Sequence, residues 1–492
     1  MTFQISKKTA IWLVLLTGLI LRLRQYLYNR SLPIDEANLA LNIIRRDYAG
    51  LCHPLSSGQG APLGFLLVEK ALTNAFGPYD YILALFPFIG GLIALFLFYK
   101  LMQALDLQNT TLIAVFLFAL SSLHINFSTD CKQYSTDILM SIVILAMWYY
   151  AYGKKLELLK ITLFGTVGAV AIWFSHPAIF ILLAVGIVEF IPRLWQKQWA
   201  ALVMVFFSSL IWSWSFLMDY LISLRYFEER KFLLAYWNDR FMPLLPFSWA
   251  SIKASMHWLN YNFWQSGLID IQPHWLIVAL LLAGSWFLIK QNKKLFFIAL
   301  FSFLSALIAS AFHKYIFFGR FLVFLIPLLL IVVAAGAGGL ITQVNTSNPI
   351  VSLITSLCLV LVLLAPIKKT LANWESPFEF EPIKPVLSYV ASHNQGHDII
   401  YFFSGSCAAG LFYAPQYDLN GKIFLGVTSL NNYSLYGRDI DRFNGSKGWF
   451  IFTHIRRNIF SYAFNYLSTH GKLLDYYQVP NASAFLFDLR KD

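Results

Sequence analysis

Two adjacent carboxylates, Asp35 and Glu36, follow the first hydrophobic run of the sequence in the segment Leu-Pro-Ile-Asp-Glu-Ala. One interpretation is a helix start, with Asp35 as the N-cap and Glu36 in the first turn, where the helix dipole favours negative charge. The other interpretation is acid–base chemistry, because a carboxylate beside the membrane can take the proton of a hydroxyl group. The two interpretations are compatible, since a capping aspartate can also be catalytic.

A second polar cluster occupies residues 126–137 and opens a later hydrophobic run. It places Asp130, Lys132, Tyr134 and Asp137 within two helical turns of each other. Tyrosine and lysine also anchor helices at the membrane–water interface, so anchoring is the alternative to chemistry at this position.

Two further segments carry polar side chains at helix ends. Trp-Phe-Ser-His-Pro places His176 at a turn, where a satisfied interfacial histidine is the alternative to a substrate ligand. The segment 313–320 contains Lys314 and Arg320 just before a long apolar run. Basic residues on the outer side oppose the usual positive-inside bias, so an anionic partner and simple snorkelling are the two explanations.

The composition shows which kind of scaffold must position these residues. Of 492 residues, 58% are hydrophobic and 13% are charged, against about 45–50% and about 25% in soluble domains. The mean hydropathy is +0.60. Basic cytoplasmic loops explain the net charge of +12. The sequence has no basic stripe, zinc-ligand spacing or RNA-binding signature, which argues against nucleic-acid binding. It also has no Cys-x-x-Cys pair.

Hydrophobic runs of spanning length recur along most of the chain. A helix needs about 20 apolar residues to cross a hydrocarbon core of about 30 Å. The first run is short and is expected to continue past Arg22. About eleven spans are predicted, at approximately residues 9–21, 81–99, 109–125, 137–152, 159–175, 177–192, 199–220, 273–289, 295–312, 318–341 and 349–366.

Basic residues gather in alternate connections between these runs. Because cytoplasmic loops are enriched in lysine and arginine, this pattern predicts a cytoplasmic N-terminus. The four connections contain Lys100; Lys154, Lys155 and Lys160; Arg193 and Lys197; and Lys290, Lys293 and Lys294.

The same count places the segments 22–80, 126–136, 221–272 and everything after residue 366 outside, while one inner turn, 342–349, carries no charge. Two amphipathic stretches of the first outer segment, 36–48 and 62–76, are expected to be helices in the interface. We predict a membrane domain over 1–366 and a soluble α/β or α+β domain over 367–492. Within the latter, strands are expected at 398–403, 449–453 and 484–489, and a helix at 383–392.

Together these features resemble the GT-C glycosyltransferases, and within them the bacterial branch of dolichyl-phosphate-mannose–protein mannosyltransferases and aminoarabinose transferases. The resemblance covers about residues 10–340 and lies in the order of the motifs. Two departures stand out: Asp130 and Lys132 replace the family's usual Glu and Arg, and Ala61 stands where a His or Lys is frequent. The matching segments are Arg22, the Asp35–Glu36 pair, 60–66, 76–77, 130–134, His176, 320–322 and 327–329.

The resemblance implies a mainly helical enzyme of the cytoplasmic (inner) membrane. It would move a hexosyl or pentosyl group, with inversion, from a polyprenyl phosphate to a glycan, lipid or protein acceptor at the outer face. No metal or other cofactor is expected, although the family also contains metal-using members. The implied roles are catalytic for Asp35 (the base), Glu36 and Asp130; donor-phosphate binding for Lys132, Lys314, Arg320 and Arg22; and substrate binding for Tyr134 and His176.

Two other functions fit a protein of this kind. A lipid-linked polysaccharide polymerase or ligase shares the donor type and the sidedness. A non-enzymatic transporter or flippase would be expected to show broken helices or repeated halves near the midplane, and the sequence shows neither. Residues 367–492 contain no clustered acid–base pair, so we expect the C-terminal domain to support acceptor recognition or stability.

Overall fold

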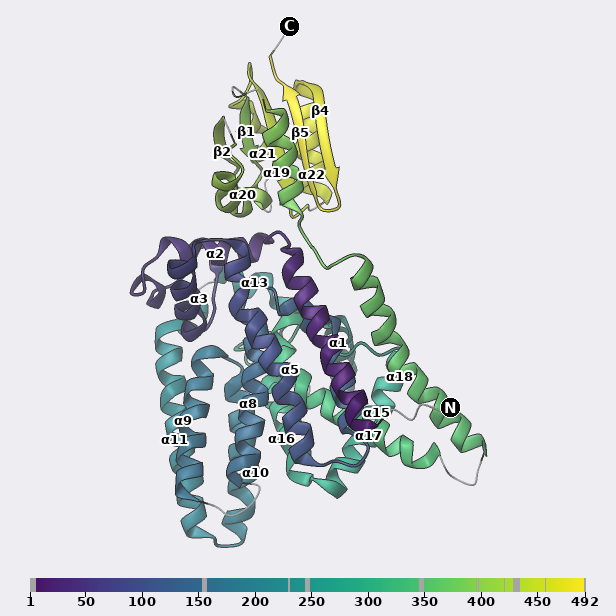
Figure 1. The fold of residues 1–492 in the computed structure, drawn as a ribbon. Helices are drawn as coiled ribbons and strands as arrows, with labels where there is room; N and C mark the ends of the chain where they lie inside the picture. Colours follow the sequence, from purple (N-terminus) through teal and green to yellow (C-terminus); the bar gives the residue numbers. More distant parts are fainter. Residues whose placement is uncertain are drawn as a thin grey trace.

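The structure is a helical bundle with a small α/β domain at one end (Figure 1). This arrangement confirms the fold class that the composition predicts. It is a computed structural model that describes residues 6–152, 157–228, 231–243, 248–344, 349–394, 396, 398–419, 421–427, 434–455 and 457–490.

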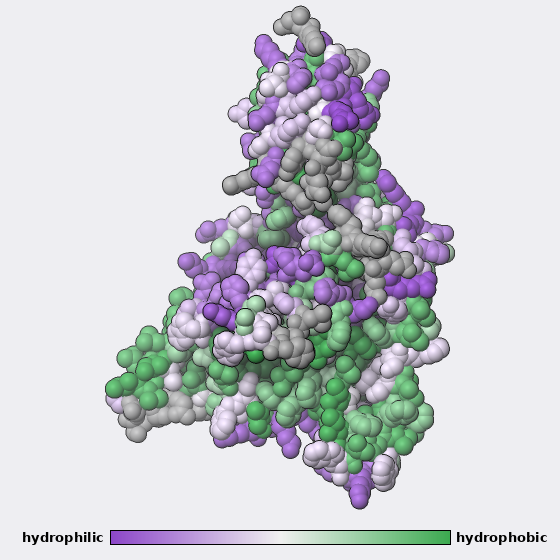
Figure 2. All heavy atoms as spheres, turned by 180° about the vertical axis from the view of Figure 1, so that it is seen from behind, coloured by the Kyte–Doolittle hydropathy of each residue, from purple (hydrophilic) through white to green (hydrophobic). Residues whose placement is uncertain are grey.

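Within these described residues, nine helices are long and apolar enough to cross a membrane. Their surface is rich in exposed leucine, phenylalanine and tryptophan, as expected for side chains that face lipid. Figure 2 shows this hydrophobic surface below the hydrophilic C-terminal domain. The nine spans are α1 (Lys7–Tyr28), α4–α5 (Asp80–Leu83, Leu85–Leu105), α8 (Tyr134–Tyr152), α10 (Ala178–Trp195), α11 (Trp199–Asp219) with the π-helical turn Tyr220–Leu224, α15 (His274–Gln291), α16 (Lys293–Ala311), the 3-10 turn Gly319–Leu325 with α17 (Ile326–Val344), and α18 (Pro349–Glu375).

The two remaining predicted spans differ from this group. One is the shorter apolar helix α9 (Leu158–Phe174). The other, expected as one continuous run at 109–125, is broken into α6 (Thr111–Ala119) and α7 (Ser122–Phe127). Arg22 lies against this break and donates hydrogen bonds to the carbonyl oxygens of the last two α6 residues, at 3.2 and 3.0 Å. Its guanidinium thus satisfies backbone groups that apolar surroundings would otherwise leave unpaired.

Both amphipathic stretches of the first outer segment are helical, as predicted. They form α2 (Ile34–Arg45) and α3 (Leu63–Phe76), which lie at the end of the bundle nearest the C-terminal domain (Figure 1). The second long outer segment forms α12 (Arg225–Glu228), α13 (Lys231–Tyr236) and α14 (Trp249–Gln265).

The C-terminal domain is a three-layer α/β structure, and its predicted strands and helix are all present. Its five-stranded sheet has the order β2-β1-β3-β5-β4; β2, β1 and β3 are parallel and the other pairs are antiparallel. One face packs on α19 and α20, and the other on α21 and α22. The elements are α19 (Ile383–His393), β1 (Ile399–Phe402), α20 (Cys407–Tyr413), β2 (Lys422–Leu425), α21 (Ser434–Asp441), β3 (Lys447–Thr453), α22 (Arg457–His470), β4 (Lys472–Val479) and β5 (Ala482–Asp488).

The junction between the two parts is tightly packed. α18 continues through Pro366 to Glu375, so the boundary expected at 366/367 falls inside a helix. An extended segment then leads to α19 (Figure 1). The hydrophobic core under α19 and α20 is continuous with buried residues of α2 and α3. The C-terminal domain is therefore docked on the outer segment that carries the Asp35–Glu36 pair.

Candidate active site

A cavity of about 1180 Å³ lies between the C-terminal domain and the end of the bundle that faces it. Six of the nine residues proposed from the sequence line it, although they come from four distant parts of the chain. Glu36, Asp130 and Arg22 are not among its lining residues. The six that line the cavity are Asp35, Lys132, Tyr134, His176, Lys314 and Arg320.

Asp35 lies in the first turn of α2 and faces the cavity. It is not the N-cap as expected: the helix begins at Ile34, and the capping position is Pro33, which has no side-chain cap bond. Arg320 Nη2 donates to Asp35 Oδ2 at 2.6 Å. Burial favours the protonated acid, but Arg320 and Lys132 outweigh it and hold the pKa of Asp35 below its usual value. Asp35 is therefore a carboxylate at neutral pH, able to accept a proton.

The cations of the cavity surround this carboxylate. Lys132 is only 5% exposed, and its Nζ donates to Gln59 Oε1 at 2.6 Å. Burial lowers the pKa of Lys132 to about 8. The Arg320 guanidinium lies over the Tyr134 ring, 5.7 Å from its centroid. With Lys314, these side chains form a positive surface suited to a phosphate.

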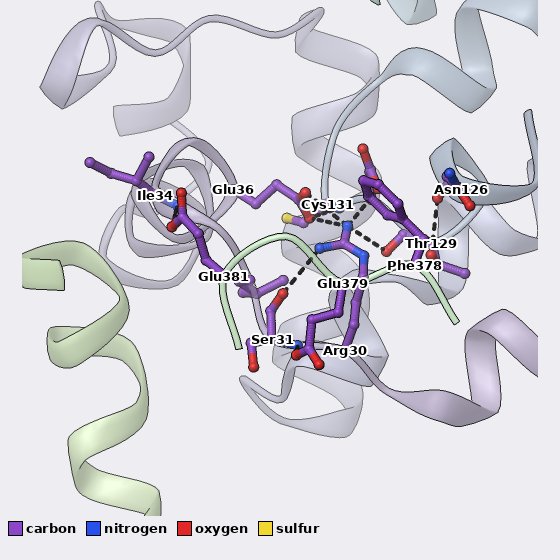
Figure 3. A network of polar contacts seen from close by, with 12 residues as sticks. Arg30, Ser31, Ile34, Glu36, Asn126, Thr129, Cys131, Phe378, Glu379 and Glu381 are labelled. Carbon is purple, nitrogen blue, oxygen red and sulfur yellow. Dashed lines mark hydrogen bonds and ion pairs between the residues drawn. The ribbon is translucent and has the colours of Figure 1, made fainter. Parts of the chain in front are cut away.

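Glu36 and Asp130 hold a buried arginine, Arg30, beside the cavity. Figure 3 shows Arg30 and Glu36 of this group turned toward each other. Arg30 Nη2 lies 2.8 Å from Glu36 Oε1 and 2.5 Å from Asp130 Oδ1. Glu36 Oε2 also accepts from the backbone N–H of Cys131 at 2.8 Å. Burial, together with the Glu36 carboxylate, raises the pKa of Asp130 to about 7. This group joins α2 to the start of α8, and so brings Asp35 and Lys132 to the same cavity.

The C-terminal domain holds the backbone that leads into Asp35. The backbone N–H groups of residues 31, 32 and 34 each donate to a side chain of that domain. Residue 33 is a proline and has no N–H group. Two of the acceptors are carboxylates, both drawn in Figure 3. The bonds join Ser31 N to Glu379 Oε1 (2.8 Å), Leu32 N to Tyr413 Oη (2.9 Å) and Ile34 N to Glu381 Oε2 (2.9 Å).

The same domain contributes a histidine to the cavity wall. His454 lines the cavity, and its Nδ1 lies 2.7 Å from Glu381 Oε1. His454 adopts a left-handed backbone conformation, with φ of 51°, which is uncommon for a residue other than glycine. It also interacts electrostatically with Asp35. The expectation that this domain lacks an acid–base pair is therefore wrong: the two residues lie 73 positions apart and leave no local pattern.

His176 has a buried partner that the sequence did not reveal. Its Nδ1 lies 2.8 Å from Oδ2 of Asp219, at the end of α11. Asp219, Arg30, Glu381 and His454 are the functional residues that motif reasoning missed, because each acquires its role through a partner on another element. Among the described residues, no group of three His, Cys, Asp or Glu side chains is arranged to hold a metal ion.

Comparison with known proteins finds likeness in structure alone. No protein-family profile matches the chain, and no curated protein matches it in sequence. ArnT from Cupriavidus metallidurans, solved with undecaprenyl phosphate, aligns over 98% of this chain and 98% of its own, with 12% identity and a TM-score of 0.55. The archaeal oligosaccharyltransferase AglB from Archaeoglobus fulgidus, solved with an inhibitory peptide and a dolichol-phosphate, aligns over 97% and 74%, with 11% identity and a TM-score of 0.50. These likenesses show a shared fold across both parts of the chain.

Proposed function

We propose that this protein, which has the GT-C fold of ArnT and AglB, transfers a sugar from a polyprenyl phosphate to a hydroxyl group of an acceptor. The observation that carries the proposal is the shared cavity. It brings an ionised carboxylate, Asp35, together with the cations Lys132, Lys314 and Arg320 at the end of a membrane bundle. A lipid-linked donor needs this combination, because its tail requires lipid while the acceptor arrives from water.

The cavity offers a different surface to each part of such a donor. The lining residues include apolar side chains from α10, α11 and the segment after it, such as Phe180, Phe216, Leu224 and Trp237. These side chains suit the polyprenyl chain. The phosphate then lies at the cations, where charge-assisted hydrogen bonds to its oxygens are strong. ArnT and AglB have been solved with undecaprenyl phosphate and dolichol-phosphate respectively, which supports the same class of donor here.

The reaction follows from this placement. The Asp35 carboxylate takes the proton of the acceptor hydroxyl while its oxygen attacks C1 of the sugar from the face opposite the phosphate. The C1–O bond to the phosphate breaks, and its electron pair leaves with the phosphate. The nearby cations stabilise this growing negative charge. The product has inverted configuration at C1, and the proposal requires no metal ion.

The C-terminal domain completes the acceptor side in this proposal. His454 lines the cavity, and Glu381 joins it to the backbone directly before Asp35. An acceptor that reaches the base therefore enters a cavity that His454 also lines. Glu381 is thus a positioning residue for both groups.

The orientation in the membrane is tested by labelling. We propose that the C-terminal domain is extracytoplasmic and the N-terminus cytoplasmic, since the basic connections lie at the other ends of the spans. In a Cys52→Ser background, a membrane-impermeant maleimide should label the Ser446→Cys variant in intact cells. The matched variant Lys197→Cys, in a basic connection, should be labelled only after permeabilisation. The reverse pattern would contradict the orientation and place the cavity on the cytoplasmic side.

Arg320→Ala should weaken use of the donor by about tenfold to a hundredfold. The reason is that a hydrogen bond to a charged group contributes about 1.5–3 kcal/mol. The measurement is kcat/KM for a purified undecaprenyl-phosphate sugar. Arg240→Ala is a suitable control, since Arg240 donates to Asn262 Oδ1 and is not among the cavity-lining residues. Unchanged kinetics for Arg320→Ala would assign that side chain to snorkelling.

The pH dependence of donor use should report the protonation of Lys132. In the free protein its ammonium is present below a pKa of about 8 and is lost as the pH rises through that value. Because kcat/KM follows groups of the free enzyme, kcat/KM for the donor should fall above about pH 8. Lys132→Arg keeps its charge, so it should lose this decline. An identical alkaline decline in both proteins would exclude Lys132 as its source.

A further inference from the structure

The floor of the cavity carries three polar atoms that the protein itself does not satisfy. They are Gln133 Oε1, Asp137 Oδ1 and His176 Nε2; each is buried and makes no hydrogen bond of normal geometry within the part of the chain that the structure describes, although the Ser175 side chain lies close to the Asp137 carboxyl. All three residues line the cavity. A buried polar group without a partner is costly, so three of them on one wall indicate a ligand.

Their positions on two elements bring the three side chains to one place. Gln133 directly precedes α8 and Asp137 lies in its first turn, where the Asp137 N–H donates to the Gln133 carbonyl oxygen at 2.8 Å, so the two residues are on one face of the helix start. His176, at the turn before α10, interacts electrostatically with Asp137. Asp137 is only 4% exposed, so it lies at depth.

All three atoms are hydrogen-bond acceptors. The carboxylate of Asp219 can only accept, so His176 Nδ1 carries the proton in the 2.8 Å contact between them. In the neutral imidazole the other ring nitrogen, Nε2, then presents a lone pair. The Gln133 amide oxygen and the Asp137 carboxylate oxygen also accept. A complementary ligand must therefore bring several donor groups in a small volume.

The position of the three acceptors relative to the cations further restricts the chemical class of the ligand. Tyr134, whose ring lies under the Arg320 guanidinium, precedes Asp137 by one turn of α8. Gln133 directly follows the cation Lys132 in the sequence, and Asp137 lies about one helical turn, roughly 5 Å of axial rise, beyond Tyr134. Ile179 and Phe180 lie among the same lining residues. Apolar walls with a few convergent polar atoms are typical of small-molecule sites.

We propose that Gln133, Asp137 and His176 form the subsite for the donor's sugar, whose hydroxyl groups donate to these three acceptors. The inference rests on the proposed function, since it takes the phosphate to be held at Arg320 and Lys132. Asp219 acts here as a positioning residue that fixes the His176 ring. The lipid phosphate alone does not reach the subsite, so the three acceptors discriminate a sugar-bearing donor from its product lipid.

Binding to two kinds of lipid tests the subsite without knowledge of the acceptor. The full-length protein in nanodiscs is titrated with undecaprenyl phosphate and with undecaprenyl phosphate bearing glucose, galactose, mannose or N-acetylglucosamine. We expect the wild type to bind at least one sugar-bearing lipid about tenfold or more tightly than the bare lipid. Asp137→Asn and Gln133→Met should each reduce that preference severalfold, and the double variant should abolish it. Affinity for undecaprenyl phosphate should change by less than about twofold.

Two controls separate the possible failures. Ser141→Ala alters a buried side chain of α8 that bonds the carbonyl oxygen of residue 137 and is not among the cavity-lining residues, so it should keep the full preference. Arg320→Ala should weaken both lipids alike. A preference that survives in the double variant, equal weakening of both lipids by Asp137→Asn, or no preference in the wild type would overturn the subsite. Failure of the wild type to bind undecaprenyl phosphate at all would instead overturn the proposed donor class, and the subsite with it.

Discussion

Asp35→Asn should lower turnover by about a hundredfold or more, with little change in donor affinity. General base catalysis is worth about 10²–10⁴-fold, and asparagine keeps the shape of the side chain without its proton affinity. The exchange also frees Arg320 from its 2.6 Å ion pair, so donor binding should not weaken. The measurements are kcat with a purified undecaprenyl-phosphate sugar and, separately, the dissociation constant of that lipid.

The control is Asp47→Asn in the same outer segment. The Asp47 carboxylate accepts from the backbone N–H of Gly50, a role that asparagine can keep, and it is not among the cavity-lining residues. This variant should turn over like the wild type. Near wild-type turnover in Asp35→Asn would move the base elsewhere. Loss of turnover in His454→Gln would then identify His454 as its replacement.

Arg30→Met should cost about 3–5 kcal/mol of stability, the usual effect of removing one partner from a buried ion pair. The physical reason is that Glu36 and Asp130 would remain in the same buried space without their shared guanidinium. Thermal unfolding of the purified protein measures the loss. A triple variant that also carries Glu36→Gln and Asp130→Asn should recover a large part of it, since the uncompensated charges are gone.

Arg46→Met provides the comparison for this prediction. Arg46 donates to two carbonyl oxygens and a serine hydroxyl of the segment between α1 and α3, and no carboxylate pairs with it among the described residues. The stability lost in Arg46→Met should therefore be clearly smaller than that lost in Arg30→Met. A loss for Arg30→Met below about 1 kcal/mol, the range of exposed pairs, would show that the Glu36–Arg30–Asp130 group does not stabilise the site.

The elements of the fold follow from local patterns, and the exceptions have physical causes. Apolar length predicts the spans, and short continuous apolar runs predict β1, β3 and β5. The break after α6 is hidden, because the serines at the break are common in membrane helices and the compensating donor, Arg22, is remote in sequence. The start of α2 was misplaced by two residues because Pro33, and not Asp35, occupies the capping position.

The residues of the candidate site also fall into two groups: those that the sequence reveals and those that it does not. Charged residues that stand out at the membrane surface, such as Asp35 and Arg320, are found from the sequence because hydrophobic surroundings make them conspicuous. Their supports are not found, because each depends on a partner far along the chain. Arg30 and Asp130 are 100 positions apart, and Glu381 lies 347 positions from the Ile34 amide that it holds. No periodicity or local motif carries such pairings.

The central claim is that the cavity binds a polyprenyl-phosphate sugar and breaks its C1–O bond to phosphate. The most direct measurement incubates the purified protein in liposomes with undecaprenyl-phosphate glucose, galactose, mannose or N-acetylglucosamine, together with membranes that supply acceptors. Release of undecaprenyl phosphate is followed by mass spectrometry. The account predicts release from at least one donor by the wild type and a loss of about a hundredfold or more in Asp35→Asn. Equal release by the two proteins, or none above a protein-free control for every donor, would contradict it.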